Sequence, residues 1–128
     1  MPVGISTANV ANPMLDWLRN VAPPAVPSLN VKLHTGDPGA AGTASPSAVT
    51  ARMVATMNPA AAGSMGLASI SGSWNMTATE TISHISVWDD NAAGDFLFSA
   101  ALLTPRNVVS GDTLTLTTLT IGHTPLAA

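Results

Sequence analysis

The densest group of side chains that could do chemistry lies at residues 89–95, where three aspartates and one asparagine stand among seven residues. Oxygen-rich loops of this kind bind Ca²⁺ when they follow the EF-hand spacing, in which a glutamate stands six residues after a glycine. Here Ala93 replaces the third ligand and Ala100 stands where the glutamate should be. The spacing therefore favours a solvated polar loop between two strands over a calcium site.

The remaining polar residues do not form a recognisable catalytic or metal-binding motif. His34, His84 and His123 each lack a second ligand two to four residues away, which is the spacing that reveals a zinc site. Serine, histidine and aspartate are all present, but no G-x-S-x-G nucleophile motif or glycine-rich phosphate loop occurs. The chain has no cysteine. We expect no enzyme activity, no cofactor and no bound metal.

The composition points to a protein that works through protein contacts. The net charge of −3 gives no electrostatic reason to bind nucleic acid, and no apolar run reaches the 18 residues of a membrane span. Only 9% of the residues are charged, against about 25% in ordinary soluble domains. Such a surface fits a chain that is covered by another protein or by copies of itself, although a small neutral, alanine-rich domain is the alternative.

One stretch near the start organises the predicted fold. Residues 29–34 alternate apolar and polar, which predicts a strand with one buried face. A turn follows at residues 35–39, where Gly36 and Gly39 can adopt positive φ and Asp37 can accept bonds from backbone N–H groups. The strand should therefore end in a tight turn and not continue into a helix.

Further strands are predicted from alternation and turn residues. Residues 81–88 and 96–103 should form an antiparallel hairpin that ends at Thr104-Pro105, and residues 113–121 a strand with a bulge near Thr117. Weaker patterns indicate strands at 52–57, 67–70 and 72–76. Together these predict a mainly β fold, an antiparallel, jelly-roll-like β-sandwich, with a barrel as the alternative.

The N-terminal part should differ from the rest. Residues 1–11 have no period and predict an arm, and Asn12-Pro13 is a typical helix start for a short helix at 13–21. The proline-rich residues 22–27 predict an extended spacer. We therefore divide the chain into an arm, helix and spacer at 1–27 and a β-sandwich domain at 28–128.

The helix is too short to be stable unless it docks. We favour a lid over one end of its own core, and the alternative is a partner-binding arm with Trp17 as its anchor. Besides residues 1–27, we expect contacts from the polar faces of two predicted strands, at residues 31–34 and 84–88. Trp74 and Trp88 could anchor an interface, although core positions are the commoner place for tryptophan. The interface candidates are Met14, Trp17, Leu18, Lys32, His34, His84 and Trp88.

Two segments resemble a known family. VKLHTGDPGAAGTA, at residues 31–44, is similar to the LHTADPG opening of small structural proteins of tailed bacteriophages. SHISVWDDNAAGDFLFSAALLTPRNVVSGDTLTL, at residues 83–116, is similar to their second half. Residues 52–80 have no counterpart in this pattern. The family contains head decoration or minor capsid proteins and tail or fibre proteins, which commonly form trimers or larger symmetric sets.

The resemblance implies a virion protein. Because the first residues, MPVGISTANV, show no basic region followed by an apolar stretch, we expect assembly in the cytoplasm of the host bacterium. The favoured expectation is a capsid decoration protein on the outer shell, whose partners are the major capsid protein and copies of itself. The alternative is a tail or fibre module, which would bind a host glycan if Trp74 or Trp88 were exposed for sugar stacking. A small metal-dependent enzyme, with convergent histidines and aspartates, is a third class to test.

Overall fold

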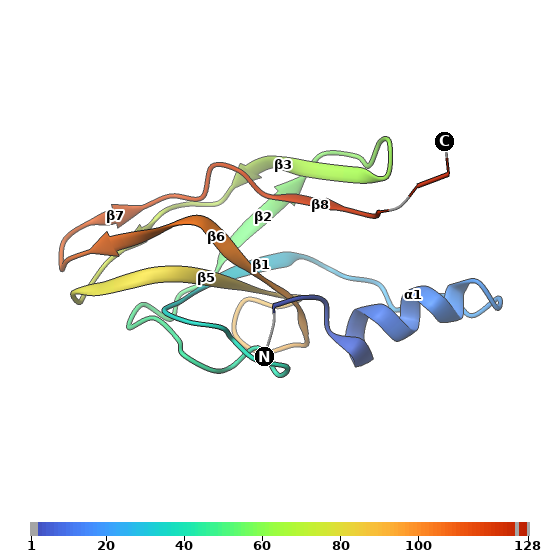
Figure 1. The fold of residues 1–128 in the computed structure, drawn as a ribbon, viewed down its shortest axis with the longest axis horizontal. Coiled ribbons are helices and arrows are strands. Elements are labelled where there is room, and N and C mark those ends of the chain that lie inside the picture. Colours follow the sequence, from blue (N-terminus) through green and yellow to red (C-terminus); the bar gives the residue numbers. More distant parts are fainter. Residues whose placement is uncertain (1–2, 125, 128) are drawn as a thin grey trace.

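A computed structural model describes residues 3–124, 126 and 127, and its strands form two antiparallel sheets (Figure 1). The predicted mainly β, sandwich-like fold is confirmed. The large sheet curls, with the strand order β6-β5-β1-β2-β3-β8, and the small sheet pairs β4 with β7. The large sheet contains β1 (Leu29–His34), β2 (Met53–Met57), β3 (Ser64–Ile70), β5 (Glu80–Trp88), β6 (Phe96–Val108) and β8 (Thr120–Gly122), and the small sheet β4 (Trp74–Asn75) and β7 (Thr113–Leu114).

The core lies between the two sheets, on the apolar face of the central strand β1. Val31 of β1 lies opposite Val87 of β5, and Leu33 lies opposite Ile85. All four side chains are buried, as the alternation in the sequence predicts. Trp74 of the small sheet joins the same cluster and is almost fully buried. Because the second layer has only two short strands, it covers the larger sheet incompletely.

The polar face of β1 is also buried, which the alternation did not predict. The exposed fractions of Asn30 and His34 are 1% and 0%. The loop at 35–52 covers this end of β1, because His34 forms an isolated bridge with Pro46 and its ring contacts the carbonyl of Ala44. Strand β1 is therefore covered on both faces, by the core on one side and by its own following loop on the other.

The turn after β1 agrees in part with the prediction. Asp37 accepts a hydrogen bond from the backbone N–H of Gly39 at 2.9 Å, and Gly39 has a φ of 77°. Gly36 is not among the residues with positive φ, so its conformation is one that other residues can adopt. A side chain at Gly36 would instead meet Ser45, which lies on the returning part of the loop.

The prediction that Thr104-Pro105 ends a strand is wrong, because β6 continues to Val108. Ile82 pairs with Arg106 and His84 pairs with Ala101, so one residue of β5 faces four residues of β6. This large bulge takes Pro105 out of the hydrogen-bonded ladder. Because β6 lies at the edge of the sheet, the missing N–H of a proline is tolerated there. The bulge leaves Leu103 fully exposed.

The single bulged strand predicted at 113–121 is also wrong. The run divides into β7, which pairs with β4, and β8, which pairs with β3. The change in apolar parity near Thr117 therefore marks a passage from one sheet to the other. Residues 115–119 connect the two sheets, and Leu119 is buried in the core.

The N-terminal arm is attached to the edge of the large sheet. Ile5 forms a bridge with Phe98 of β6, the N–H of Ser6 donates to the carbonyl of Leu97, and the N–H of Ser99 donates to the carbonyl of Gly4. The division at residue 27 stays a prediction. No helix in the described part of the chain is long and apolar enough to cross a membrane.

The helix that follows begins earlier than predicted. A π-helical turn, η1 (Thr7–Ala11), leads directly into α1 (Asn12–Trp17). Ser6 caps it by accepting a bond from the N–H of Asn9, whereas Asn12 is itself helical. A serine followed by small residues gives a weaker start signal than Asn-Pro. Asn20, with a φ of 71°, ends the following turn.

Replacing Gly42 should show how strongly the 35–52 loop is held against β6. Gly42 has a φ of 74°, and a Cβ there would overlap the ring of Phe96. We expect Gly42→Ala to lower the free energy of unfolding by about 2–4 kcal/mol, from backbone strain and overpacking together. Gly111→Ala is the matched control, because Gly111 has a φ of 97° but no atom near its Cβ, so only the strain of about 1–2 kcal/mol applies. Equal losses in urea denaturation would contradict the packing argument.

Candidate interaction surface

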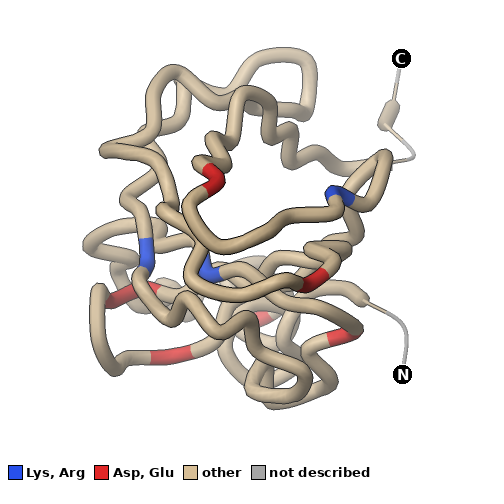
Figure 2. Tube along the Cα trace, turned by 90° about the vertical axis from the view of Figure 1, so that its left-hand side faces the viewer, with Lys and Arg blue, Asp and Glu red and all other residues tan. Residues whose placement is uncertain are grey.

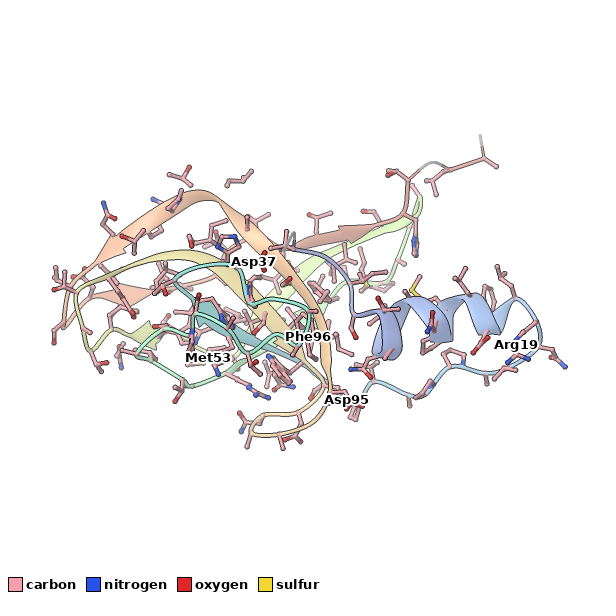
Figure 3. All side chains as sticks on the ribbon, turned by 60° about the horizontal axis from the view of Figure 1, so that its bottom comes forward. Arg19, Asp37, Met53, Asp95 and Phe96 are labelled. Carbon is pink, nitrogen blue, oxygen red and sulfur yellow. The ribbon has the colours of Figure 1, made fainter. Side chains whose placement is uncertain are left out.

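The helical arm presents apolar side chains to solvent. Leu15, Trp17 and Leu18 are exposed by 65%, 65% and 75%. Met14 and Val21 are exposed on the same segment, which extends beyond the two sheets with Arg19 near its far end (Figure 3). Scattered exposed leucines are ordinary, but five large apolar residues within eight positions form an unpartnered patch. We call this patch, made of Met14, Leu15, Trp17, Leu18 and Val21, the apolar arm.

Among the described residues, the hydrogen bonds that attach the apolar arm to the large sheet lie at its base. Asn9 donates a hydrogen bond from its side chain to the carbonyl of Phe96 at 2.9 Å, beside the backbone bonds of Ser6. Beyond that point the arm borders a hollow of about 310 Å³, which Pro23 and His123 complete. A helix this short gains little stability from its own hydrogen bonds. Its apolar side chains therefore lack the packing that normally stabilises an amphipathic helix.

A second apolar surface lies where the two sheets fail to close. A groove of about 580 Å³ runs between residues 100–106 of β6 and residues 114–120. Leu33, Trp74 and Ile85 of the core form its floor. Leu102, Leu114 and Leu116 line this groove, and each packs against the core while staying only partly buried. We call this surface the edge groove.

The residues predicted as contacts fall into two groups. Met14, Trp17 and Leu18 lie together on the apolar arm, exposed to solvent. The sheet residues lie elsewhere, where Lys32 and His84 are half-buried, and His34 and Trp88 are buried within the chain. The side chains of His34 and Trp88 therefore do not reach a partner in this conformation.

The sequence patterns missed the edge groove and part of the arm. Leu15 lies beside predicted contacts, but Leu103 and the leucines at 114 and 116 were assigned to ordinary strands. Two signals mark the groove in retrospect. One is Pro105 inside an alternating run, and the other is the change in parity near Thr117.

His34 belongs to a buried hydrogen-bond network that links β1 to β5. Its Nδ1 lies 2.8 Å from the carbonyl oxygen of Ala44, so Nδ1 carries the proton. Its Nε2, 2.7 Å from Oγ of Ser86, is then the acceptor, and Ser86 in turn accepts from Nε1 of Trp88 at 2.8 Å. Burial lowers the pKa of His34, and the nearby charge of Lys32 acts in the same direction. The neutral imidazole fits this network.

The serine and histidine of this network cannot act on a substrate in this arrangement. The exposed fractions of both Ser86 and His34 are 0%, so no external carbonyl reaches Oγ. Within residues 3–124, 126 and 127, no three His, Asp or Glu side chains come together as a metal site. The network is built to hold β1, β5 and the 35–52 loop together.

The acidic loop at 89–95 uses its oxygens on its own backbone. Asp90 accepts from the N–H groups of Ala92 and Ala93, and these bonds lower the pKa of its carboxyl. Arg52 donates to the carbonyls of Asp90 and Ala93, and its guanidinium lies 4.5 Å from the ring centre of Trp88. The loop is therefore fastened to the polar face of the sheet.

Charged groups are sparse over the whole molecule. The chain has four lysines and arginines and seven acidic residues, and Figure 2 shows them scattered along the trace. Arg106 is the one charged residue that lines the edge groove. The apolar arm carries the pair Asp16 and Arg19, joined at 2.8 Å. Both unpartnered surfaces are thus nearly neutral.

The buried His34 should make the fold less stable in mild acid. Because its pKa in the folded protein is lowered from 6.5, the unfolded chain binds a proton first as the pH falls. The free energy of unfolding should be complete above about pH 6.5 and should decrease below it, by at most about 1.4 kcal/mol per pH unit for one proton. Urea denaturation between pH 7.5 and 5, above the usual carboxylate range, measures this. A flat profile, or an NMR titration of His34 centred above pH 6.5, would contradict it.

Removing the hydroxyl of Ser86 should be costly, because His34 and Trp88 would each lose a buried partner. We expect Ser86→Ala to lower the free energy of unfolding by about 2–4 kcal/mol. Ser83→Ala is the matched control, since Ser83 also bonds a histidine, His84, but at a partly exposed site. That change should cost less than about 1 kcal/mol. Thermal or urea denaturation of both variants compares the two sites directly.

Comparison with known proteins bears on the whole chain. A comparison with curated proteins gives no match. The model of one family, described as podophage GP4 fiber I protein gp80, matches residues 4–124. This match includes residues 52–80, for which the motif resemblance had no counterpart, and it covers the arm, both sheets and the edge groove. A phage fibre family implies a structural component of the virion. The chain therefore belongs to the family of the podophage GP4 fiber I protein gp80.

Proposed function

We propose that this chain is a fibre subunit of a bacteriophage virion and that it acts by binding other proteins, not by catalysis. The observation that carries the proposal is the apolar arm, which is too exposed for a protein that works alone. The family match supports the fibre role, and the edge groove supplies a second surface for contact. The partners we propose are copies of the same chain and neighbouring virion proteins.

The low charge supports the same role. Charged side chains keep a monomer soluble, and a subunit that buries its surface against neighbours needs fewer of them. The same low charge also fits the capsid decoration protein, bound to the major capsid protein, that the motif resemblance favours. Low charge alone does not separate the two roles, whereas the family match favours the fibre. We therefore propose the fibre role ahead of decoration.

Glycan binding by the core tryptophans is not part of the proposal. Trp74 and Trp88 have exposed fractions of 1% and 9%, so neither presents a ring face on which a sugar could stack. The indole N–H of Trp74 donates to the carbonyl of Ala51, and that of Trp88 donates to Ser86. Both rings are structural.

The number of copies per virion tests the fibre role. Quantitative mass spectrometry of purified particles, against the major capsid protein, should find a small fixed number of this chain. Antibody labelling under the electron microscope should place it on fibres. Copies in fixed ratio to the capsid subunit, with label over the shell, would replace the fibre role by capsid decoration. Absence of the chain from purified particles would contradict both.

A further inference from the structure

The two unpartnered surfaces lie on different parts of the molecule. The apolar arm leaves the sheet beside the first residues of β6, where Asn9 bonds to Phe96 and Ile5 pairs with Phe98. The edge groove lies along the other part of the same strand, at residues 100–106, and continues to β7. Along the long axis of the molecule, α1 is at one end and β7 is at the other (Figure 1). The arm therefore points away from the groove of its own chain.

The two surfaces match in chemistry. Leucine, threonine and alanine side chains dominate the lining of the groove, and the arm presents leucine, methionine and tryptophan. Arg106 is the one charge of the groove lining, and Asp16 is the one acidic residue of the arm. Asp16 and Arg19 form an exposed ion pair. Because surface ion pairs are weak, this one can break at little cost in free energy. An acidic group on the arm can then approach Arg106.

The two surfaces also match in size. Helix α1 and the turn that follows it, residues 12–20, span about 14 Å at the rise of an α-helix. Residues 114–120, which form one wall of the groove, span about 23 Å when extended. The groove volume of about 580 Å³ lies within the range of about 300–1,000 Å³ typical of sites that enclose a ligand. The exposed part of the arm is therefore shorter than the wall of the groove.

We propose that the apolar arm of one copy seats in the edge groove of the next copy, so that the chains associate head to tail. This proposal rests on the proposed fibre role and names the partner as a second copy of the chain. The interface is heterologous, because two different surfaces meet. Repeated contacts of this type close into a ring or extend as a filament, according to the rotation between successive copies.

Disulfide trapping tests which surfaces meet, and the chain has no native cysteine to interfere. Leu18→Cys marks the arm and Leu103→Cys marks the rim of the groove, and both side chains are exposed. When the two variants are mixed under mild oxidation, a disulfide should join one copy of each. Neither variant alone should cross-link efficiently. Val54→Cys, an exposed position on β2 outside both surfaces, is the matched control and should not cross-link with either.

Three outcomes would overturn the head-to-tail arrangement. Efficient cross-linking of Leu18→Cys with itself would show that arms meet arms. A disulfide within single chains of the double variant Leu18→Cys/Leu103→Cys would show that the arm folds back on its own groove. No cross-link in the mixture, with the wild type monomeric in sedimentation up to about 1 mM, would show that the surfaces do not associate.

Charge substitution gives an independent readout. Leu18→Asp and Leu103→Asp should each raise the dissociation constant for self-association at least about tenfold. The thermal midpoint should stay unchanged in dilute solution, because both side chains are exposed. Val54→Asp is the control and should leave association intact, and equal association of all three variants would overturn the proposal. Virion copy number and labelling test the fibre role separately, so a fibre protein that fails these association tests refutes only the head-to-tail contact.

Discussion

The fold depends on burying both faces of β1, of which only one is apolar. The apolar face is stabilised by packing in the hydrophobic core around Val31 and Leu33, without hydrogen-bond partners. The polar face is buried at a cost unless each group finds a partner, and His34 meets that condition by bonding both ring nitrogens. Those two bonds connect the strand to the 35–52 loop on one side and to β5 on the other. The fold thus depends on a polar network as much as on its hydrophobic core.

The sequence patterns predicted the parts of the fold that depend on local alternation. Residues 29–34 and 81–88 form strands because each places β-branched or leucine side chains on one face. The polar loop at 89–95 joins the second of these strands, β5, to β6 in a hairpin. Which loop packs over the polar face of a strand is not encoded in the local alternation. Whether His34 faces water or the 35–52 loop depends on where that loop returns, which no alternation in β1 reveals. For the same reason the alternation could not decide between an interface and a buried position for Trp88, which is buried beside Phe96 and Arg52.

The candidate surfaces were predicted unequally for a related reason. The helix of the apolar arm could be predicted, because helical spacing and an adjacent proline spacer are local signals. Its exposure could not, since the lid over the core that we favoured would bury Met14, Trp17 and Leu18, which are exposed. The edge groove could not, because it arises from the difference in size between two sheets. Only the assembled structure shows that β4 and β7 are too short to cover β6. A groove that forms where one sheet fails to cover the other has no sequence motif by which it could be predicted.

The bulge around Pro105 has a consequence for how the chain avoids uncontrolled aggregation. An exposed edge strand offers a row of backbone donors and acceptors that can recruit further strands without limit. Pro105 removes one backbone donor from β6, and the four-residue bulge breaks the regular spacing of the others. Residues 4–6 of the N-terminal segment bond to the edge at residues 97–99 and cover it there. Amyloid-like stacking along β6 is thereby blocked while the side chains of the groove stay accessible. This protection matters in a chain with few charged side chains, because mutual repulsion between copies does little to prevent edge-to-edge pairing.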